Sequence, residues 1–570
     1  MLRDARDLLP DTEVETDVCV VGSGPAGQAV ALGLDGLPVR VTVLESGGPE
    51  PDAALDDLGV TDPVRFGGLE RVDAKRRLGG NASAWTVDTG ATRNGIRLVP
   101  LSAADHEARA CVPSSGWPLG ADAFAPYVRR AQRVFGLPAT SFEGEAWADD
   151  RHRALPLDPA RVVTRVFQFG EGTAFTRDHP ATLAASPNVT VLHHATALGL
   201  EQGPDGRVAA VRAASAPRRG LRIRAAHTVL AGGGLGTTQL LLASVAEGTL
   251  ALGEAEEHLG RWFHDHLLLH GGRLIPAAPG LVDALRLYDL RRVGGVPVMG
   301  HLALADEALR GEPLLQLSAV LFPSSGPLTA RGQAGVDAAV RVRAALRAGA
   351  VPAAGDVLGA ARGLGGVTRR GLTSVVAATS HWSRGGWSAL PAWRLRMLRE
   401  LHVDHQAEQA PHRDNRVVLG EGRDAFGMRR VTVDWRWHDE DVAKTVRAQE
   451  VYAHELARAG VGRLLLARDG DGGRDGRPVV LSPSTGHYLG TTRMGRTPRT
   501  GVVDERCRVH GVDNLLVAAG STFPTGGFAN PTLSIVALAL RIADDLKRTR
   551  GLTTAPPTDV ATTPAASRAS

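Results

Sequence analysis

The stretch DVCVVGSGPAGQAVALGLDGLPVRVTVLE, from Asp17 to Glu45, decides the fold of this 570-residue chain. The apolar run Val18–Val21 predicts a buried strand, and it leads directly into a turn with the spacing GxGxxG. The segment Gln28–Leu34 predicts a helix, and Val39–Leu44 predicts a second strand that ends at Glu45. This order is typical of a βαβ unit that binds a dinucleotide.

A physical requirement explains why glycine stands at each of the three positions of the turn. Gly22 permits the tight bend, Gly24 lets the backbone approach a pyrophosphate, and Gly27 allows the helix to pack closely on the strand. The N-terminus of the helix adds the positive end of its dipole. Glu45 would accept hydrogen bonds from the adenosine ribose hydroxyls. A glycine turn with a structural role alone is the alternative, but the whole βαβ unit fits the binding role.

Two further segments have the order strand, glycine turn, helix. They are His227–Gly236, with a helix over Thr238–Ser244, and Leu515–Ala518, with Gly520 and a helix over Ser534–Lys547. We therefore predict a nucleotide-binding domain assembled from residues 14–100, 186–270 and 480–548. Residues 101–185 and 271–479 would form a second, substrate-binding domain.

Three other segments have distinctive composition. Val189–Leu192 and Val208–Val211 flank the turn Gly203–Gly206 and suggest strands of a small antiparallel layer. Residues 323–372 are rich in Ala and Arg and predict a helical lid or surface insertion, while a basic amphipathic helix that touches a membrane or an electron-accepting partner is the alternative. The Thr-, Ala- and Pro-rich tail, 549–570, predicts disorder.

The composition excludes several classes of protein. A hydrophobic content of 43% and a charged content of 22% are ordinary for a globular protein. The 65 Lys and Arg residues against 61 Asp and Glu leave a net charge of only +4, without a basic stripe, so nucleic-acid binding is not expected. The three cysteines have no metal-binding spacing. With no signal peptide in the first fifteen residues and no transmembrane-length apolar run, we expect a cytoplasmic protein.

Two motifs near the C-terminus carry residues suited to catalysis. The motif GHYLGTTRMG, Gly486–Gly495, contains His487, and GGFANPTL, Gly526–Leu533, contains Asn530. Histidine suits proton transfer because its unperturbed pKa lies near the working pH. Asparagine can hold a substrate oxygen by a hydrogen bond, which is positioning rather than base chemistry.

Along nearly its whole length the chain resembles the glucose-methanol-choline (GMC) oxidoreductases. Besides the glycine turn and the C-terminal motifs, the matching segments are Glu45–Gly48 (ESGG), Leu78–Trp85 (LGGNASAW), Val229–Gly236, Gly260–His266 (GRWFHDH) and Asn415–Leu419 (NRVVL). The resemblance implies an α/β fold with added antiparallel β structure. A Rossmann-like FAD-binding domain of discontinuous segments would join a substrate domain built on an antiparallel sheet flanked by helices.

Within the family, Gly79-Gly80 and the segment Ser114–Pro118 (SSGWP) look most like the branch of pyranose oxidases, bacterial sugar oxidases and antibiotic-tailoring dehydrogenases. Some members attach FAD covalently through a histidine just before the tryptophan of the glycine segment. Here that position is Ala84, so we predict that FAD is bound non-covalently.

The resemblance also implies roles for individual residues. His487 would be the catalytic base, with neutral Nε2 receiving the hydroxyl proton, and Asn530 would hold the substrate oxygen. Gly79 to Ser83 would run along the flavin ring, and the Asn530-Pro531-Thr532 turn would start the last helix. The predicted cofactor-binding residues are Gly22, Gly24, Pro25, Ala26, Gly27, Glu45, Ser46, Gly79, Gly80, Asn81, Ser83, Ala197, Gly232, Ala519, Gly520, Pro531 and Thr532.

The cluster His264-Asp265-His266 suggests a metal site, but a third ligand at a known spacing is missing. Because the family has Asp-His here without a metal, we expect a structural role for this segment and no metal. Trp382, Trp387 and Trp393 could line a sugar-binding cleft or pack in the core.

The predicted function is FAD-dependent oxidation of a hydroxyl to a carbonyl, by hydride transfer to flavin N5 with His487 as base. The substrate would be a sugar, glycoside or aminocyclitol-type alcohol. An alcohol that is an intermediate of natural-product biosynthesis is one version of this expectation. The electron acceptor would be O₂ or a quinone or redox protein, and the oligomeric state stays open. A hydroxynitrile lyase with structural FAD and an NAD-binding reductase are the alternatives.

Overall fold

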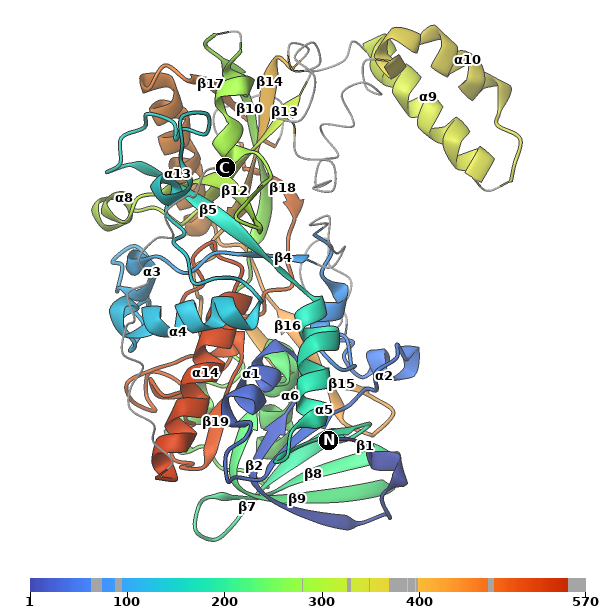
Figure 1. Cartoon of the computed structure of the whole chain (residues 1–570), viewed down its shortest axis with the longest axis vertical. Coiled ribbons are helices and arrows are strands. Elements are labelled where there is room, and N and C mark those ends of the chain that lie inside the picture. The colour runs from blue at the N-terminus through green and yellow to red at the C-terminus, as the bar shows by residue number, and fades with distance from the viewer. Residues whose placement is uncertain are drawn as a thin grey trace, which may run out of the picture.

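The molecule is built on two large β-sheets that lie at opposite ends of its long axis (Figure 1). The computed structural model describes residues 1–62, 74–87, 95–278, 280–324, 330–347, 349–368, 387, 395, 398–469 and 476–551. One sheet is mostly parallel and the other is antiparallel, with helices packed against both. The predicted fold class is therefore confirmed.

The mostly parallel sheet contains the predicted βαβ unit. Its order is β1-β6-β3-β2-β9-β8-β7, with β19 paired to β9. Its strands are β1 (Leu2–Asp4), β2 (Thr12–Val21), β3 (Val41–Glu45), β6 (Val189–His193), β7 (Thr196–Gln202), β8 (Val208–Ala216), β9 (Arg219–Leu230) and β19 (Leu515–Val517). Val18–Val21 of β2 lies in parallel register with Val41–Leu44 of β3. All five residues of β3 are buried, which explains its continuous apolar run.

One prediction about this sheet was wrong. Val189–Leu192 does not join an antiparallel layer, because β6 lies parallel to β3 and to β1. The strands on either side of the turn Gly203–Gly206 are β7 and β8, and these two do pair antiparallel. The composition of an isolated strand does not tell which neighbour it will pair with, and this is the physical reason for the error.

Helices α1 (Pro25–Leu34), α6 (Gly233–Ala246) and α14 (Thr532–Thr549) follow the strands β2, β9 and β19. Helices α1 and α14 pack together closely, since a Cβ added at Gly33 would lie 2.6 Å from the Cβ of Ala543. Helix α4 (Ala121–Val134) also packs against α14. Shorter helices are α2 (Ala53–Asp57), α3 (Ala103–His106) and α5 (His179–Ala185).

The second sheet has the order β17-β10-β14-β13-β12-β5-β4, with β11 paired to β12 and β18 to β10. Its strands are β4 (Gly95–Leu98), β5 (Val162–Glu171), β10 (Leu267–Pro276), β11 (Arg291–Val293), β12 (Val296–Leu304), β13 (Ser318–Ser324), β14 (Glu400–Ala407), β17 (Gly462–Leu466) and β18 (Val479–Ser482). Helix α13 (Asp439–Arg458) packs against β17 and β5, and its buried Tyr452 donates a hydrogen bond to the carbonyl of Leu317 at 2.6 Å. The remaining elements are the ribbon β15 (Arg416–Arg423) and β16 (Arg429–Asp434) and helices α7 (Leu281–Ala284) and α8 (Asp306–Gly311).

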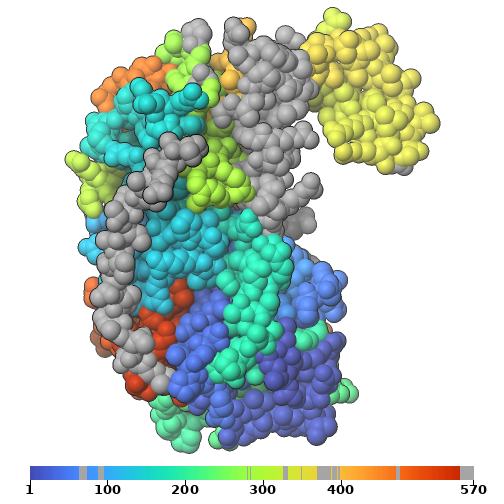
Figure 2. Space-filling model, in the orientation of Figure 1, coloured from blue at the N-terminus to red at the C-terminus, as the bar shows by residue number. Residues whose placement is uncertain are grey.

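The described part of the predicted insertion forms helices α9 (Ala330–Arg347) and α10 (Ala354–Arg362), which pack against each other. The pair stands apart from both sheets in Figures 1 and 2. Several large apolar side chains in this region are exposed, namely Val340, Leu346, Val351, Val357, Leu358 and Leu364. Among the described residues, no helix is long and apolar enough to cross a membrane. Most of the predicted disordered tail, from residue 552 onward, lies outside the described residues.

Candidate active site

A cavity of about 720 Å³ lies where residues of the two sheets meet. The mostly parallel sheet contributes the glycine turns that follow β2 and β9, and the antiparallel sheet contributes side chains of β4, β5, β12 and β13. Among the sequence-predicted site residues, the cavity is lined by Gly22, Gly24, Pro25, Ala26, Glu45, Ser46, Gly80, Asn81, Ala197, Gly232, His487, Ala519, Gly520, Asn530, Pro531 and Thr532. Segments far apart in the sequence therefore meet at one site.

The glycine turn after β2 is shaped for a ligand that touches its backbone. Gly22 has φ +107°, and a Cβ at this position would lie 2.5 Å from the carbonyl oxygen of Ala231, so only glycine fits. A Cβ at Gly24, in contrast, would meet no atom within 4 Å, and this residue faces the cavity at the N-terminus of α1. Open space beside a helix N-terminus is what a pyrophosphate requires.

The other three predicted residues support this wall from behind. A Cβ at Gly27 would lie 1.9 Å from the carbonyl oxygen of Gly22, which shows how closely α1 approaches β2. The backbone N–H of Gly79 donates to the carbonyl of Ser23 at 3.3 Å, and the Ser83 hydroxyl donates to the carbonyl of Gly80 at 2.9 Å. Residues 79–83 thus pack directly on the glycine turn.

Glu45 is buried at the end of β3 and lines the cavity. Its carboxylate accepts hydrogen bonds from the Ser23 N–H at 3.0 Å, the Ser23 hydroxyl at 2.7 Å and the Gly47 N–H at 3.0 Å. Burial raises the pKa of Glu45, while these hydrogen bonds lower it. Arg76, which the sequence analysis did not single out, also lines the cavity, and its charge lies close enough to attract Glu45.

His487 lines the cavity and lies in the loop between β18 and β19. Its Nε2 accepts from the Asn530 amide Nδ2 at 3.4 Å, and both residues line the cavity. Its Nδ1 lies 2.8 Å from Nδ1 of His266 and 2.7 Å from Oγ1 of Thr485. The two ring nitrogens therefore face different partners, one toward the cavity and one toward the protein.

The partners of His266 fix where the protons lie. His266 Nε2 is 2.9 Å from the carbonyl oxygen of Gly527, which can only accept, so Nε2 carries a proton. Burial lowers the pKa of His266, so its ring is neutral and Nδ1 is an acceptor. Nδ1 of His487 must then be the donor between the two rings. His487 is left with an unprotonated Nε2 that faces the cavity.

Burial also holds the pKa of His487 well below its usual value, and the nearby charge of Arg97 and the adjacent titratable ring of His266 lower it further. His487 is consequently neutral at ordinary pH. A neutral imidazole with an unprotonated Nε2 at the cavity is the form required of a general base.

Asp265, between β10 and the His487 loop, fixes this arrangement. Its Oδ1 accepts from the backbone N–H groups of His266 at 2.6 Å and His487 at 3.1 Å, and from the Thr485 hydroxyl at 3.0 Å. Because Thr485 donates its proton to Asp265, its oxygen is free to accept from His487 Nδ1. The sequence analysis expected only a structural role for this segment, whereas Asp265 and His266 hold the histidine at the site.

Comparisons with known proteins agree with this arrangement. A family model described as GMC oxidoreductase matches residues 411–539, which include both His487 and Asn530. The 2-methyl-1,2-propanediol dehydrogenase of Mycolicibacterium austroafricanum is 23% identical over 603 residues, covering 94% of this chain and 95% of that protein. The chain is a GMC oxidoreductase. It is therefore an FAD-dependent oxidoreductase, as the sequence predicted.

Other relatives match this GMC oxidoreductase over shorter stretches. The 6'''-hydroxyparomomycin C oxidase of Streptomyces lividus is 34% identical over 144 residues, about a quarter of each protein: 25% of this chain and 24% of the relative. The crystal structure of formate oxidase superposes with a TM-score of 0.52 over 96% of this chain and 100% of the other, at 16% identity, and shows a shared fold. These relatives are oxidases and a dehydrogenase, so the lyase alternative is not favoured.

Arg97 is the main residue of the GMC oxidoreductase site that the sequence analysis missed. It lies on β4, lines the cavity, and donates from Nε to Asn530 Oδ1 at 3.2 Å. Gln406 donates from Nε2 to the same oxygen at 3.3 Å, and its own Oε1 accepts from Arg97 Nη2. Because Asn530 Oδ1 is held by two donors, the amide nitrogen must face His487. Burial lowers the pKa of Arg97 to about 10, so it stays charged.

Of the three tryptophans expected either to line a cleft or to pack in the core, Trp387 lies among the described residues. Trp387 is buried, and its backbone N–H donates to Asp289 at 3.1 Å, so it belongs to the core of this GMC oxidoreductase and not to the cavity wall. Trp382 and Trp393 lie outside the described residues.

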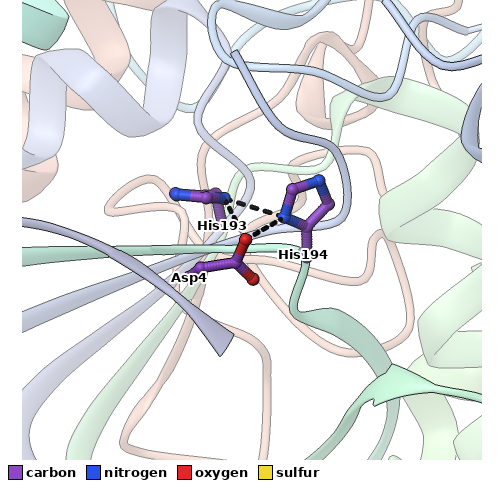
Figure 3. A group of neighbouring side chains, drawn as sticks. All are labelled: Asp4, His193 and His194. Carbon is purple, nitrogen blue, oxygen red and sulfur yellow. Dashed lines mark hydrogen bonds and ion pairs between the residues drawn. The ribbon is translucent and has the colours of Figure 1, made fainter. Parts of the chain in front are cut away.

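Figure 3 shows a second histidine cluster, which consists of Asp4, His193 and His194. None of these three residues lines the cavity. Nδ1 of His193 and Nδ1 of His194 are 2.9 Å apart, and the latter is 3.1 Å from Asp4 Oδ2. The side chain of Arg6 donates to both oxygens of Asp4, so a cation already neutralises this carboxylate. We interpret the cluster as a set of side-chain contacts that connects β1 to the end of β6.

Proposed function

We propose that this GMC oxidoreductase oxidises a hydroxyl of a sugar, glycoside or related small-molecule alcohol to a carbonyl, with His487 as the base. The observation that carries the proposal is the proton arrangement from Gly527 through His266 to His487, which leaves Nε2 of His487 unprotonated at the cavity. The names of relatives agree with the substrate class, since they include a propanediol dehydrogenase and a C-glycoside 3-oxidase of Arthrobacter globiformis.

The geometry suggests where the hydroxyl binds. Nε2 of His487 and Nδ2 of Asn530 are 3.4 Å apart, so one substrate oxygen can reach both. The substrate O–H would donate to Nε2, and the amide Nδ2–H would donate to the substrate oxygen. Two fixed contacts on one oxygen define its position, which lowers the entropic cost of reaching the reactive geometry.

Proton transfer is the step that these residues perform. His487 Nε2 takes the hydroxyl proton, and Asn530 stabilises the negative charge that develops on the oxygen. The ring becomes an imidazolium whose Nδ1–H is already bonded to His266 and Thr485, close to the carboxylate of Asp265. FAD, when bound, supplies the acceptor for the hydride that leaves the carbinol carbon.

The cavity wall suits non-covalent FAD. Gly24 leaves room for the pyrophosphate, Glu45 can bind the ribose hydroxyls, and Arg76 adds positive charge. Ala84, which stands where some relatives have a flavin-linked histidine, lines the cavity and offers no nucleophile. Acid precipitation tests this: all flavin should stay in the supernatant, and yellow protein in the pellet would contradict non-covalent binding.

Anaerobic stopped-flow spectroscopy tests the reaction. The purified yellow protein is mixed with neutral sugars, sugar acids, glycosides and simple alcohols while the flavin absorbance is followed. Bleaching by an alcohol supports the proposal, and a flavin-loaded enzyme that no alcohol reduces would contradict it. Re-admitting air then shows whether O₂ is the acceptor; slow reoxidation points to a quinone or redox protein. The expected cytoplasmic location stays a prediction.

A further inference from the structure

Arg97 carries a positive charge that faces the cavity, and no carboxylate of the described residues pairs with it. Its side chain is enclosed by β4, β5 and β14 and lies 4.5 Å above the ring of Phe167. Within the part of the chain that the structure describes, two of its five N–H donors are used, by Asn530 and Gln406. Both acceptors are neutral amides. Among the described residues, no carboxylate lies within 4.0 Å of its guanidinium.

This is unusual because burying a charge is costly unless an opposite charge accompanies it. The same region shows how the chain normally meets this cost: Arg109 forms a bidentate ion pair with Glu408, and both side chains are almost completely buried. Arg97 instead lies on a surface that a ligand can reach. The missing negative charge is therefore expected on what occupies the cavity.

The position of Arg97 indicates which occupant supplies that charge. Arg97 contacts Asn530, the residue that holds the reacting oxygen, so a group bonded to the carbon beside the reacting carbinol can reach it. The FAD phosphates are expected at the glycine turn near Gly24, and the guanidinium of Arg76, another cation that lines the cavity, lies beside Gly236 of the second glycine turn. A planar guanidinium with free N–H donors matches the two oxygens of a carboxylate.

We propose that Arg97 forms an anion subsite and that the natural substrate is a hydroxy acid, an alcohol with a carboxylate close to the reacting carbinol. The inference rests on the proposed function and names the substrate class of that same site. It also predicts discrimination against alcohols that carry an ammonium group near the carbinol, because two cations would then share one cavity and repel each other. Aldonic and uronic acids, which combine a sugar-like chain with a carboxylate, fit both requirements.

A pair of ligands that cannot react tests the subsite by binding alone. The compounds 2-hydroxy-2-methylpropanoate and its amide have the same shape, but neither has a hydrogen on the carbinol carbon, so neither can be oxidised. Each is titrated into the FAD-loaded enzyme while the flavin spectrum and the thermal unfolding midpoint are recorded. We expect the acid to bind at least tenfold more tightly than the amide. Equal affinity, including no binding of either, would overturn the proposal.

Substitutions of Arg97 test whether this side chain causes the tighter binding of the acid. Arg97→Gln should remove the preference for the acid. Arg97→Lys should keep part of it, since an ammonium retains the positive charge but lacks the planar pair of N–H donors that can bind both carboxylate oxygens. Arg224→Gln, at an exposed residue of β9 outside the cavity wall, is the matched control and should behave as wild type. A preference that persists in Arg97→Gln would place the subsite elsewhere and contradict the inference. If that variant does not fold, the wild-type acid and amide titrations decide alone.

The binding and kinetic results separate the two proposals. Anaerobic reduction is compared for an oxidisable pair, a uronic acid and its amide. Tighter binding of the non-reactive acid without flavin reduction by any alcohol would support the subsite and contradict alcohol oxidation. Reduction by neutral sugars, with no preference for acids in either assay, would support the oxidation and contradict the subsite.

Discussion

Replacing Asp265 by asparagine should slow flavin reduction strongly while leaving the site intact. The side chain keeps its shape, but it loses the negative charge that faces the imidazolium formed on His487. The ligand atoms of Asp265, His266 and His487 all lie within 4.8 Å of one another. At 4.8 Å and an effective dielectric constant of about 20, two unit charges interact by about 3.5 kcal/mol.

A loss of about 3.5 kcal/mol at full charge development corresponds to a rate lower by a factor of about 10² to 10³. Substrate affinity should hardly change, because His487 is neutral before the reaction. The assay is anaerobic stopped-flow measurement of the limiting reduction rate and of the substrate concentration at half-maximal rate. Flavin content and the unfolding midpoint show that the variant is folded.

The control is Asp404→Asn, which removes the carboxylate from another aspartate–histidine pair. Asp404 Oδ1 lies 2.9 Å from Nδ1 of His270, outside the cavity wall. This variant should reduce at the wild-type rate. If Asp265→Asn also reduced at the wild-type rate with FAD bound, the assignment of Asp265 to imidazolium stabilisation would be refuted.

Three other predictions concern the cofactor site and stability. Glu45→Ala should raise the dissociation constant of FAD about 10- to 100-fold, because a charge-assisted hydrogen bond is lost; equilibrium dialysis checks this, and unchanged retention would count against the ribose role. Gly22→Ala should lower the free energy of unfolding by about 2–4 kcal/mol, whereas Gly355→Ala, with open space around its Cβ, should not; chemical denaturation distinguishes the two. Burial lowers the pKa of His264 to about 3 and of His405 to about 4, so the unfolded chain binds more protons below pH 6.5. Stability should therefore fall from pH 6.5 toward pH 4, and an unfolding midpoint constant over that interval would contradict this.

The sequence predicts those parts of the site that rest on local patterns. The βαβ unit could be recognised because Val18–Val21, the glycine turn and Glu45 lie within thirty residues, and the structure places them as expected. The start of α14 beside Asn530-Pro531-Thr532 is equally local. In these segments the backbone conformation and the spacing of residues carry the information.

The parts that the sequence could not reveal depend on distant contacts. Arg97 meets Asn530 across 433 positions, and His266 meets His487 across 221. No spacing rule connects such pairs, because it is the folded structure that brings β4 beside Asn530 and the residue before β10 beside His487. The pattern His264-Asp265-His266 indicated an unusual segment. It did not indicate that this segment would orient the ring of His487.

Anaerobic reduction of His487→Ala, measured beside wild type, tests the central claim most directly. His152→Ala, at a surface loop residue outside the cavity wall, is the control. With FAD bound and the same alcohol at saturation, the rate of flavin reduction should fall by about 10²-fold or more, and the control should match wild type. Reduction of the His487→Ala flavin at the wild-type rate would contradict the account that this histidine is the base.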